Sequence, residues 1–431
     1  MRYIYMNNFR GFTHTLIPLR QGNFLVGENS TGKSSFLALL SLMNQAAFWL
    51  NPTFSIRDGR DTSLFSDLVS AWSSNNDSFQ VGLVTTEKEK SDNIRLTFHI
   101  HEFVEQDDVP VLGRSTKQRN KQISSIAFEK KSTKYKIEHT ENTYESEADA
   151  VEAFLSIAKS QDIDTSDWKP FPKGVPPRPP LPMATSIVQS MERGEDINEL
   201  KYELEIPMGM PITWIAPIRT KPKRIYDGTR TAYSPEGEHA PLLLRKTLKS
   251  KASSKKFANS LIEFGNSSGL FDTVIAHSFG SGNKNPFELL IKFKGAELNI
   301  NNVGYGVSQV LPLIVEFMTT DKRRGFAVQQ PEVHLHPKAQ AALGGLIFEL
   351  AKEKEHVFFV ETHSDYLIDR YRLSMRQAKT PPDSQMLFFE RTPTGNKVYA
   401  LVISEDGLYP KDQPKGFREF FLKEELMLLE I

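Results

Sequence analysis

Residues Gly27-Glu28-Asn29-Ser30-Thr31-Gly32-Lys33-Ser34 match the phosphate-loop pattern G-x-x-x-x-G-K-[ST] without a gap. Glycines in such a loop let backbone amides close around a β-phosphate, and the following helix directs its positive end at the anion. We expect Lys33 to neutralise the β- and γ-phosphates and Ser34 to offer its hydroxyl to Mg²⁺. The sequence therefore predicts a site for ATP and Mg²⁺, formed by Asn29, Ser30, Thr31, Gly32, Lys33, Ser34 and Ser35.

The segments on either side of the loop supply the context that the pattern requires. Residues 22–26 are typical of a short buried strand, and residues 35–43 are typical of an apolar helix. Strand, glycine loop and helix therefore follow one another in the order of a nucleotide-binding α/β domain.

A second set of candidate residues lies in the last third of the chain. Gly306 and Ser308 come just ahead of an apolar helix, an arrangement suited to meeting a phosphate at a helix N-terminus. Two further buried strands are expected at 325–328 and 356–360. The first is followed by Gln329-Gln330-Pro331-Glu332-Val333-His334-Leu335-His336-Pro337, and the second by Glu361-Thr362-His363-Ser364.

Four motifs of this chain resemble motifs of the ABC-type ATPase heads of the recombination, chromosome-structuring (SMC) and OLD-type (overcoming lysogenization defect) families. They also follow one another in the same order. The chain is most similar to bacterial AAA members with the hallmarks N-F-R-G-F, V-G-Y-G-V-S-Q-V-L-P, Q-P-E-x-H-L-H-P and E-T-H-S, which stand here at 8–12, 303–312, 330–337 and 361–364. The resemblance covers roughly residues 1–100 and 210–405. It implies an α/β fold: an ABC-type P-loop ATPase head with a mixed sheet, a helical lobe and an inserted segment.

The resemblance also implies roles for individual residues. Two heads of such families dimerise face to face, so Gly306 and Ser308 would touch the γ-phosphate held by a second copy. His363 would be the switch histidine that senses this phosphate, although it could merely be hydrogen-bonded in a turn. His334 and His336 would lie in the D-loop at the dimer seam, with metal binding as the alternative.

The chain departs from the pattern where hydrolysis needs carboxylates. Such sites normally carry one carboxylate that holds Mg²⁺ through water and a second that orients the attacking water. Both positions are glutamines here, Gln329 and Gln330, and an amide is not a useful base. Either glutamates were replaced to trap ATP, or the natural chain hydrolyses ATP slowly; we favour the second because trapping needs only one replacement. Glu332 and Glu361 are the nearby carboxylates that could compensate, and we assign the catalytic positions to Gln329, Gln330, Glu332 and His363.

Composition excludes several other classes of protein. Lys plus Arg and Asp plus Glu both total 53, so no global charge attracts nucleic acid or a membrane, and any DNA contact must be local. The chain has no cysteine, which excludes disulfides and thiolate metal sites. No apolar run is long enough to cross a membrane, so we expect a soluble cytoplasmic protein.

We expect the 431 residues to form four parts. These are the first half of the head at 1–105, an insertion at 106–210 with basic and acidic stretches and a proline-rich linker, the second half of the head at 211–405, and a helical tail at 406–431. Basic clusters at 114–136, 219–230 and 245–256 could line a DNA channel, with a solvated face as the plainer interpretation. Arg219 or Arg224 could approach the nucleotide, and His99 and His101 are expected on a solvated strand face.

The leading hypothesis from this resemblance is an ATPase subunit of a bacterial anti-phage defence system. It would form a homodimer or higher homo-oligomer through ATP, hydrolyse ATP slowly, and control a separate nuclease or toxin effector, since the residues after Asp365 leave no room for a nuclease module. The alternatives are a DNA repair or recombination ATPase of the SMC/RecF-like type, and a scaffold in which ATP is a fixed cofactor.

Overall fold

The structure is a computed structural model, which describes residues 1–50, 52, 54, 64–72, 77–159, 164–193, 210–229, 232–250, 254–280, 282, 284–320 and 322–419. The chain divides into two compact units, each built from separate stretches of sequence. Unit 1 contains residues 1–19, 28–209 and 389–398, and unit 2 contains residues 20–27, 210–388 and 399–431.

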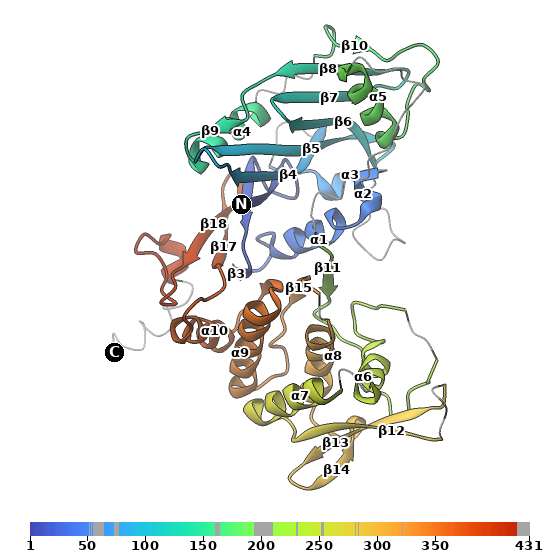
Figure 1. Ribbon diagram of the computed structural model, residues 1–431, viewed down its shortest axis with the longest axis vertical. Coiled ribbons are helices and arrows are strands. Elements are labelled where there is room, and N and C mark those ends of the chain that lie inside the picture. The colour runs from blue at the N-terminus through green and yellow to red at the C-terminus, as the bar shows by residue number, and fades with distance from the viewer. Residues whose placement is uncertain are drawn as a thin grey trace. The chain divides into compact units, whose positions relative to one another are not determined.

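Unit 1 is built on an antiparallel sheet. In the part of the chain that is described, its strand order is β10-β8-β7-β6-β5-β4-β1-β2, with the short β9 paired to β5 (Figure 1). The strands are β1 (Arg2–Asn7), β2 (Thr15–Leu19), β4 (Ser78–Lys88), β5 (Ile94–Gln106), β6 (Val109–Arg119), β7 (Gln122–Phe128), β8 (Thr133–His139), β9 (Thr143–Tyr144) and β10 (Lys169–Pro170). The basic cluster expected at 114–136 continues this sheet as β6 to β8.

Helices cover both faces of this sheet. The helices of unit 1 are α1 (Lys33–Met43), α2 (Ala46–Leu50), α3 (Phe65–Leu68), α4 (Glu147–Lys159) and α5 (Leu181–Arg193). On β7, Ile123 packs with Phe154 of α4 whereas Ile126 packs with Val188 of α5. Because these two isoleucines are an odd number of positions apart, they point to opposite faces, so α4 and α5 lie on opposite sides of the sheet. Most of the proline-rich segment at 169–182 runs without regular structure from β10 to the start of α5.

Unit 2 is built on a sheet with a parallel core. Its described order is β11-β15-β16-β3-β17-β18, and the first four strands are parallel to one another. The strands are β3 (Gly22–Gly27), β11 (Ile212–Ile215), β15 (Gly325–Gln329), β16 (Val357–Glu361), β17 (Ser384–Thr392) and β18 (Gly395–Ile403). Every residue of β3, β15 and β16 is buried, as expected for continuous apolar strands covered on both faces.

Helices and a small second sheet complete unit 2. The helices are α6 (Ala240–Lys249), α7 (Ser254–Ser268), the 3₁₀ turn η2 (Ile300–Asn302), α8 (Tyr305–Thr319), α9 (Pro337–Lys354) and α10 (Asp365–Gln377), and the small antiparallel sheet contains β12 (Thr273–Ser278), β13 (Phe287–Phe293) and β14 (Ala296–Asn299) (Figure 1). One continuous core joins the strands to α8, α9 and α10 through side chains such as Phe24, Phe317, Phe358 and Tyr371. The expectation of an α/β fold with a mixed sheet is therefore confirmed.

The C-terminal tail is described only as far as residue 419. Residues 415–419 are helical, and Phe417 is buried against Phe388 and Tyr409. The expectation of a helical tail at 406–431 is wrong for residues 406–414, which form turns and irregular structure. Residues 420–431 lie outside the described residues, as do Arg230 and part of the basic cluster at 245–256. None of the described helices is long and apolar enough to cross a membrane.

Candidate nucleotide site

The phosphate loop joins β3 to α1, as the sequence predicts. Gly32 is the N-cap of α1 and has a φ of 98°, a conformation that favours glycine. Lys33 is buried at 3% exposure, and its Nζ donates to the Glu28 carbonyl at 2.6 Å. The Thr31 hydroxyl donates to the same carbonyl at 2.8 Å. These two side-chain contacts tie the start of the loop to the start of α1.

The turn at residues 9–12 packs against this loop. A Cβ placed on Gly32 would lie 2.3 Å from Cζ of Phe12, so the ring of Phe12 leaves room only for glycine. Residues 389–398 of the β17–β18 hairpin belong to the same unit as the loop. Within this unit, Arg391 Nη2 donates to the Ser30 carbonyl at 2.6 Å, and the Asn396 N–H donates to the Gly11 carbonyl at 2.7 Å. The N-F-R-G-F motif therefore packs against the phosphate loop, a role that the sequence alone did not reveal.

The loop residues fit the phosphates of ATP and a magnesium ion. Glu28, Asn29 and Ser30 are exposed, and the loop amides precede the positive end of α1. Ser34 is exposed in the first turn of α1 and would offer its hydroxyl to Mg²⁺, an ion that proteins usually hold by few side chains together with substrate phosphates. Within the described ranges, no group of three or more His, Asp or Glu side chains could hold a metal ion.

The carboxyl ends of β3, β16 and β15 meet at one edge of the parallel sheet. Leu25 pairs with Glu361, and Glu361 pairs with Gln329, so the end of β3 lies in register with both polar residues. Gln329 and Glu361 are buried, and Gln329 Nε2 donates to Glu361 Oε2 at 3.1 Å. The buried carboxylate nearest Gln329 therefore belongs to the next strand of the sheet.

The turn after β15 positions Gln330 and Glu332. Gln330 has a φ of 43°, and its N–H donates to the Glu361 carbonyl at 2.7 Å. Glu332 Oε1 accepts the backbone N–H of His363 at 2.8 Å, so this carboxylate joins the turns after β15 and β16. Helix α9, which begins at Pro337, is capped by His336, whose side chain accepts the Ala339 N–H. The imidazole of His363 is exposed at the same edge.

The glycines of the second motif lie at the start of α8. Gly304 is the N-cap, so Gly306 and Ser308 belong to the first turn of the helix and do not precede it. A Cβ on Gly306 would lie 2.7 Å from the His334 carbonyl oxygen, which shows how closely the two motifs approach. Ser308 is buried, and its hydroxyl donates to the Tyr305 carbonyl at 2.8 Å. Tyr305 itself is exposed and stacks edge-on against His334.

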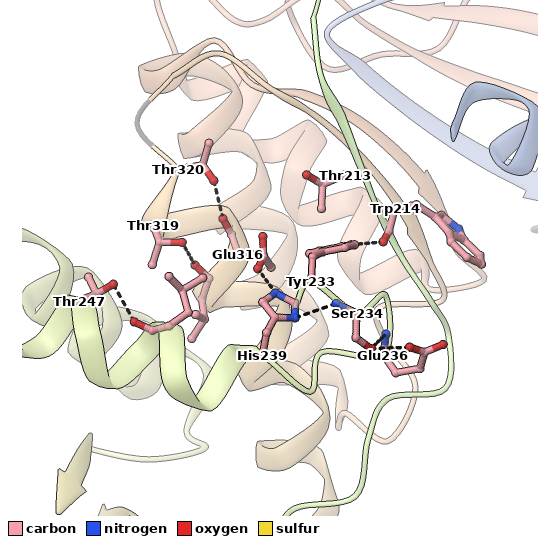
Figure 2. A network of polar contacts seen from close by, with 12 residues as sticks. Thr213, Trp214, Tyr233, Ser234, Glu236, His239, Thr247, Glu316, Thr319 and Thr320 are labelled. Atoms are coloured by element: carbon pink, nitrogen blue, oxygen red, sulfur yellow. Dashed lines mark hydrogen bonds and ion pairs between the residues drawn. The ribbon is translucent and has the colours of Figure 1, made fainter. Parts of the chain in front are cut away.

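A partly buried polar network connects α8 to the loop before α6. Figure 2 shows His239 between the two elements: its Nδ1 accepts the Ser234 N–H at 3.2 Å, so its Nε2 carries the proton and donates to Glu316 of α8. The ring of Tyr233 packs on His239, and the Tyr233 hydroxyl donates to the Trp214 carbonyl in β11. The sequence did not point to this network, because His239 and Glu316 meet only in the folded chain.

The histidine pair and part of the basic cluster at 114–136 are less exposed than the side chains of a solvated face. His99 is half-buried and His101 is fully buried beside Trp49, so the expected solvated face is wrong; burial lowers the pKa of His101 to about 3.

In the cluster at 114–136, Arg114 pairs with the buried Glu102 at 2.8 Å. Lys134 and Lys136 pair with Glu129 and Glu138, so these three cations already have partners.

The sequence matches the family described as the AAA ATPase domain over residues 1–172 and 219–368. These ranges cover well over half of the chain. The protein belongs to the AAA ATPase domain family. The match includes the phosphate loop, the α8 motif and the ends of β15 and β16, so nucleotide binding by this AAA ATPase domain follows from family and geometry together.

Several solved structures resemble this chain at low sequence identity. No curated protein matches it. An SMC head bound to the C-winged helix domain of ScpA is 15% identical with a TM-score of 0.43, covering 94% of this chain and 98% of that chain. The SMC head domain from Thermotoga maritima is 12% identical with a TM-score of 0.39, covering 93% and 99%. An Smc head with an extended coiled coil, bound to a ScpA domain and derived from Pyrococcus furiosus, is 12% identical with a TM-score of 0.40, covering 100% and 99%.

Proposed function

We propose that this chain is an ATP-dependent control subunit of a bacterial anti-phage defence system. It holds ATP with slow hydrolysis, dimerises through the nucleotide and governs a separate nuclease or toxin effector. The observation that carries the proposal is the pair of amides, Gln329 and Gln330, at the sheet edge where β3 leads into an intact phosphate loop. The similarity of the four motifs to those of defence-associated ATPases supports the assignment to this kind of system.

The site residues suit retention of ATP better than its turnover. Lys33 and Ser34 would hold the phosphates and Mg²⁺, and the ion would supply charge neutralisation when bound. Gln329 can orient a water through its amide but adds no negative charge for the metal. Glu332 is the carboxylate that would accept a proton from the attacking water, since Oε1 is held by the His363 N–H and Oε2 has no described partner. One carboxylate two residues beyond the usual position is consistent with slow hydrolysis.

The start of α8 is suited to meeting a nucleotide held by a second copy of the chain. Gly304 and Tyr305 are exposed, and the helix directs its positive end outward at this point. A Cβ on Gly304 would have no heavy atom within 4 Å, and its φ of −55° suits any residue. A substitution at Gly304 can therefore change this surface without disturbing the fold.

Gly304→Asp tests the ATP-dependent dimer. Aspartate is a good N-cap residue, so the melting temperature should be unchanged or slightly raised. The new carboxylate would face the phosphate of the second copy, and we expect the dissociation constant of the ATP dimer to rise on the order of 100-fold. Sedimentation with and without ATP measures this constant. Gly304→Ser is the matched control, because it caps the helix without a charge and should dimerise like the natural chain. Equal dimerisation of all three proteins would show that α8 does not lie at the seam.

A DNA repair or recombination ATPase is the second candidate. Lys117 and Arg119 favour it, because both line a hollow of about 390 Å³ on unit 1 between the sheet and α5. Stimulation of ATP turnover by double-stranded DNA, with a steep dependence on salt, would support this function over control of an effector.

A further inference from the structure

Arg219 and its neighbour Ile218 occupy unexpected environments in unit 2. Arg219 is 2% exposed, whereas Ile218 is 80% exposed. Arginine is rarely buried without a partner that compensates its charge, and isoleucine is usually buried. A local pattern reversed in this way is expected where function, not stability, determines the positions of side chains.

The guanidinium of Arg219 lies at the carboxyl edge of the parallel sheet and has unused donors. Its Nη2 donates to the Gln329 carbonyl at 3.2 Å. Its Nε and Nη1 are buried and have no hydrogen-bond partner among the described residues. Burial lowers the pKa of Arg219 to about 10, so the group still carries its charge at neutral pH. A buried cation with open donors is costly unless a ligand completes its contacts.

Glu332 has a matching open position beside this cation. Its charge acts on Arg219 and raises the pKa of the guanidinium, against the effect of burial. No ion pair or hydrogen bond joins the two groups, although both belong to the described part of unit 2. Glu332 Oε2 is buried without a partner. A hydrogen-bond acceptor of a ligand that bound Arg219 here would therefore lie next to Glu332, the carboxylate that would accept a proton from the attacking water.

The network around His239 holds the backbone that carries Arg219. The Ala216 N–H donates to the Pro235 carbonyl at 3.1 Å, and the Thr220 N–H donates to the Glu236 carbonyl at 2.9 Å. The loop from Ser234 to His239 is in turn bound to Glu316 of α8 (Figure 2). The position of Arg219 therefore depends on a loop that is anchored to the helix expected to meet the second nucleotide.

We propose that Arg219 binds an oxygen of the γ-phosphate and is the residue by which this site distinguishes ATP from ADP. The inference rests on the proposed nucleotide site and adds to it a specificity-determining residue outside the phosphate loop. Guanidinium groups bind phosphate oxygens through several donors at once, which fits the two open donors of Arg219.

Calorimetric titration of the full chain with ATP and with ADP, both with Mg²⁺, tests the proposal by affinity. Arg219→Ala should weaken ATP binding on the order of 10- to 100-fold, the loss expected for a charged hydrogen bond, and leave ADP binding within about 2-fold. Arg324→Ala is the matched control. Arg324 Nη1 donates to Thr213 Oγ1 at 2.9 Å just before β15, at the amino edge of the same strands. This control should leave the ratio of the two affinities unchanged.

Arg219→Lys and Arg219→Gln decide the question if the alanine variant does not fold. Lysine keeps the charge and should retain most of the preference for ATP, whereas the neutral glutamine should lose it. An unchanged ratio in Arg219→Ala or Arg219→Gln would overturn the inference and leave Arg219 as a partner of the Gln329 carbonyl only. That result would leave the proposed function intact, whereas natural protein that binds neither nucleotide would overturn both.

Discussion

Lys33→Ala should lower the affinity for ATP on the order of 100-fold or more, because it removes the one buried ammonium of the phosphate loop that the structure describes. Lys33 is 3% exposed and is held by the Glu28 carbonyl, so its charge is already placed within the loop before nucleotide binds. Preorganised charge of this kind gives more affinity than a mobile surface lysine. Calorimetric titration with ATP and Mg²⁺ measures the loss.

A matched control separates this effect from a general loss of structure. Alanine is a good helix former at the first position of α1, so the melting temperature of Lys33→Ala should change by only a few degrees. Lys173→Ala removes an exposed lysine from the proline-rich segment of the same unit and should bind ATP normally. Unchanged ATP binding by a folded Lys33→Ala protein would mean that the nucleotide binds elsewhere.

Gln330→Glu should raise the rate of ATP hydrolysis by about 10²- to 10⁴-fold, the range that a positioned general base contributes. The backbone at Gln330 is fixed by the turn and by its bond to the Glu361 carbonyl, and glutamate is nearly isosteric with glutamine. The same change at Gln329 would instead place a second buried carboxylate beside Glu361 Oε2, where repulsion would raise the pKa of one of the two carboxyls. Phosphate release at saturating ATP measures the gain.

Gln330→Met is the control for this gain, since it keeps the length of the side chain but supplies no base. Its turnover should equal that of the natural chain or fall below it. A Gln330→Glu protein that binds ATP but shows no faster phosphate release would show that the missing carboxylate does not limit hydrolysis.

The sequence was sufficient to predict the local parts of the site. Strand β3, the phosphate loop and α1 follow one another without interruption, and the apolar runs of β15 and β16 end directly at their polar residues. Short-range patterns of this kind determine local structure through backbone chemistry and burial, so they need no knowledge of distant segments.

Contacts between distant segments could not be predicted in the same way. Arg391 reaches the Ser30 carbonyl and Arg219 reaches the Gln329 carbonyl only because the chain folds them together. Arg114 looked like one of several free cations, yet the cross-strand partner Glu102 neutralises it. His101 looked exposed because it alternates with apolar residues on a strand, but Trp49 of α2 covers that face.

The most direct test is to purify the natural protein, identify any bound nucleotide by mass spectrometry and follow phosphate release after Mg²⁺ is added. Our account predicts bound ATP and a turnover well below about 1 s⁻¹, the low end of ordinary enzymes. Steady turnover at or above that rate would contradict it, because another carboxylate would then replace Gln329 and Gln330, and a cycling DNA repair ATPase would become the better description.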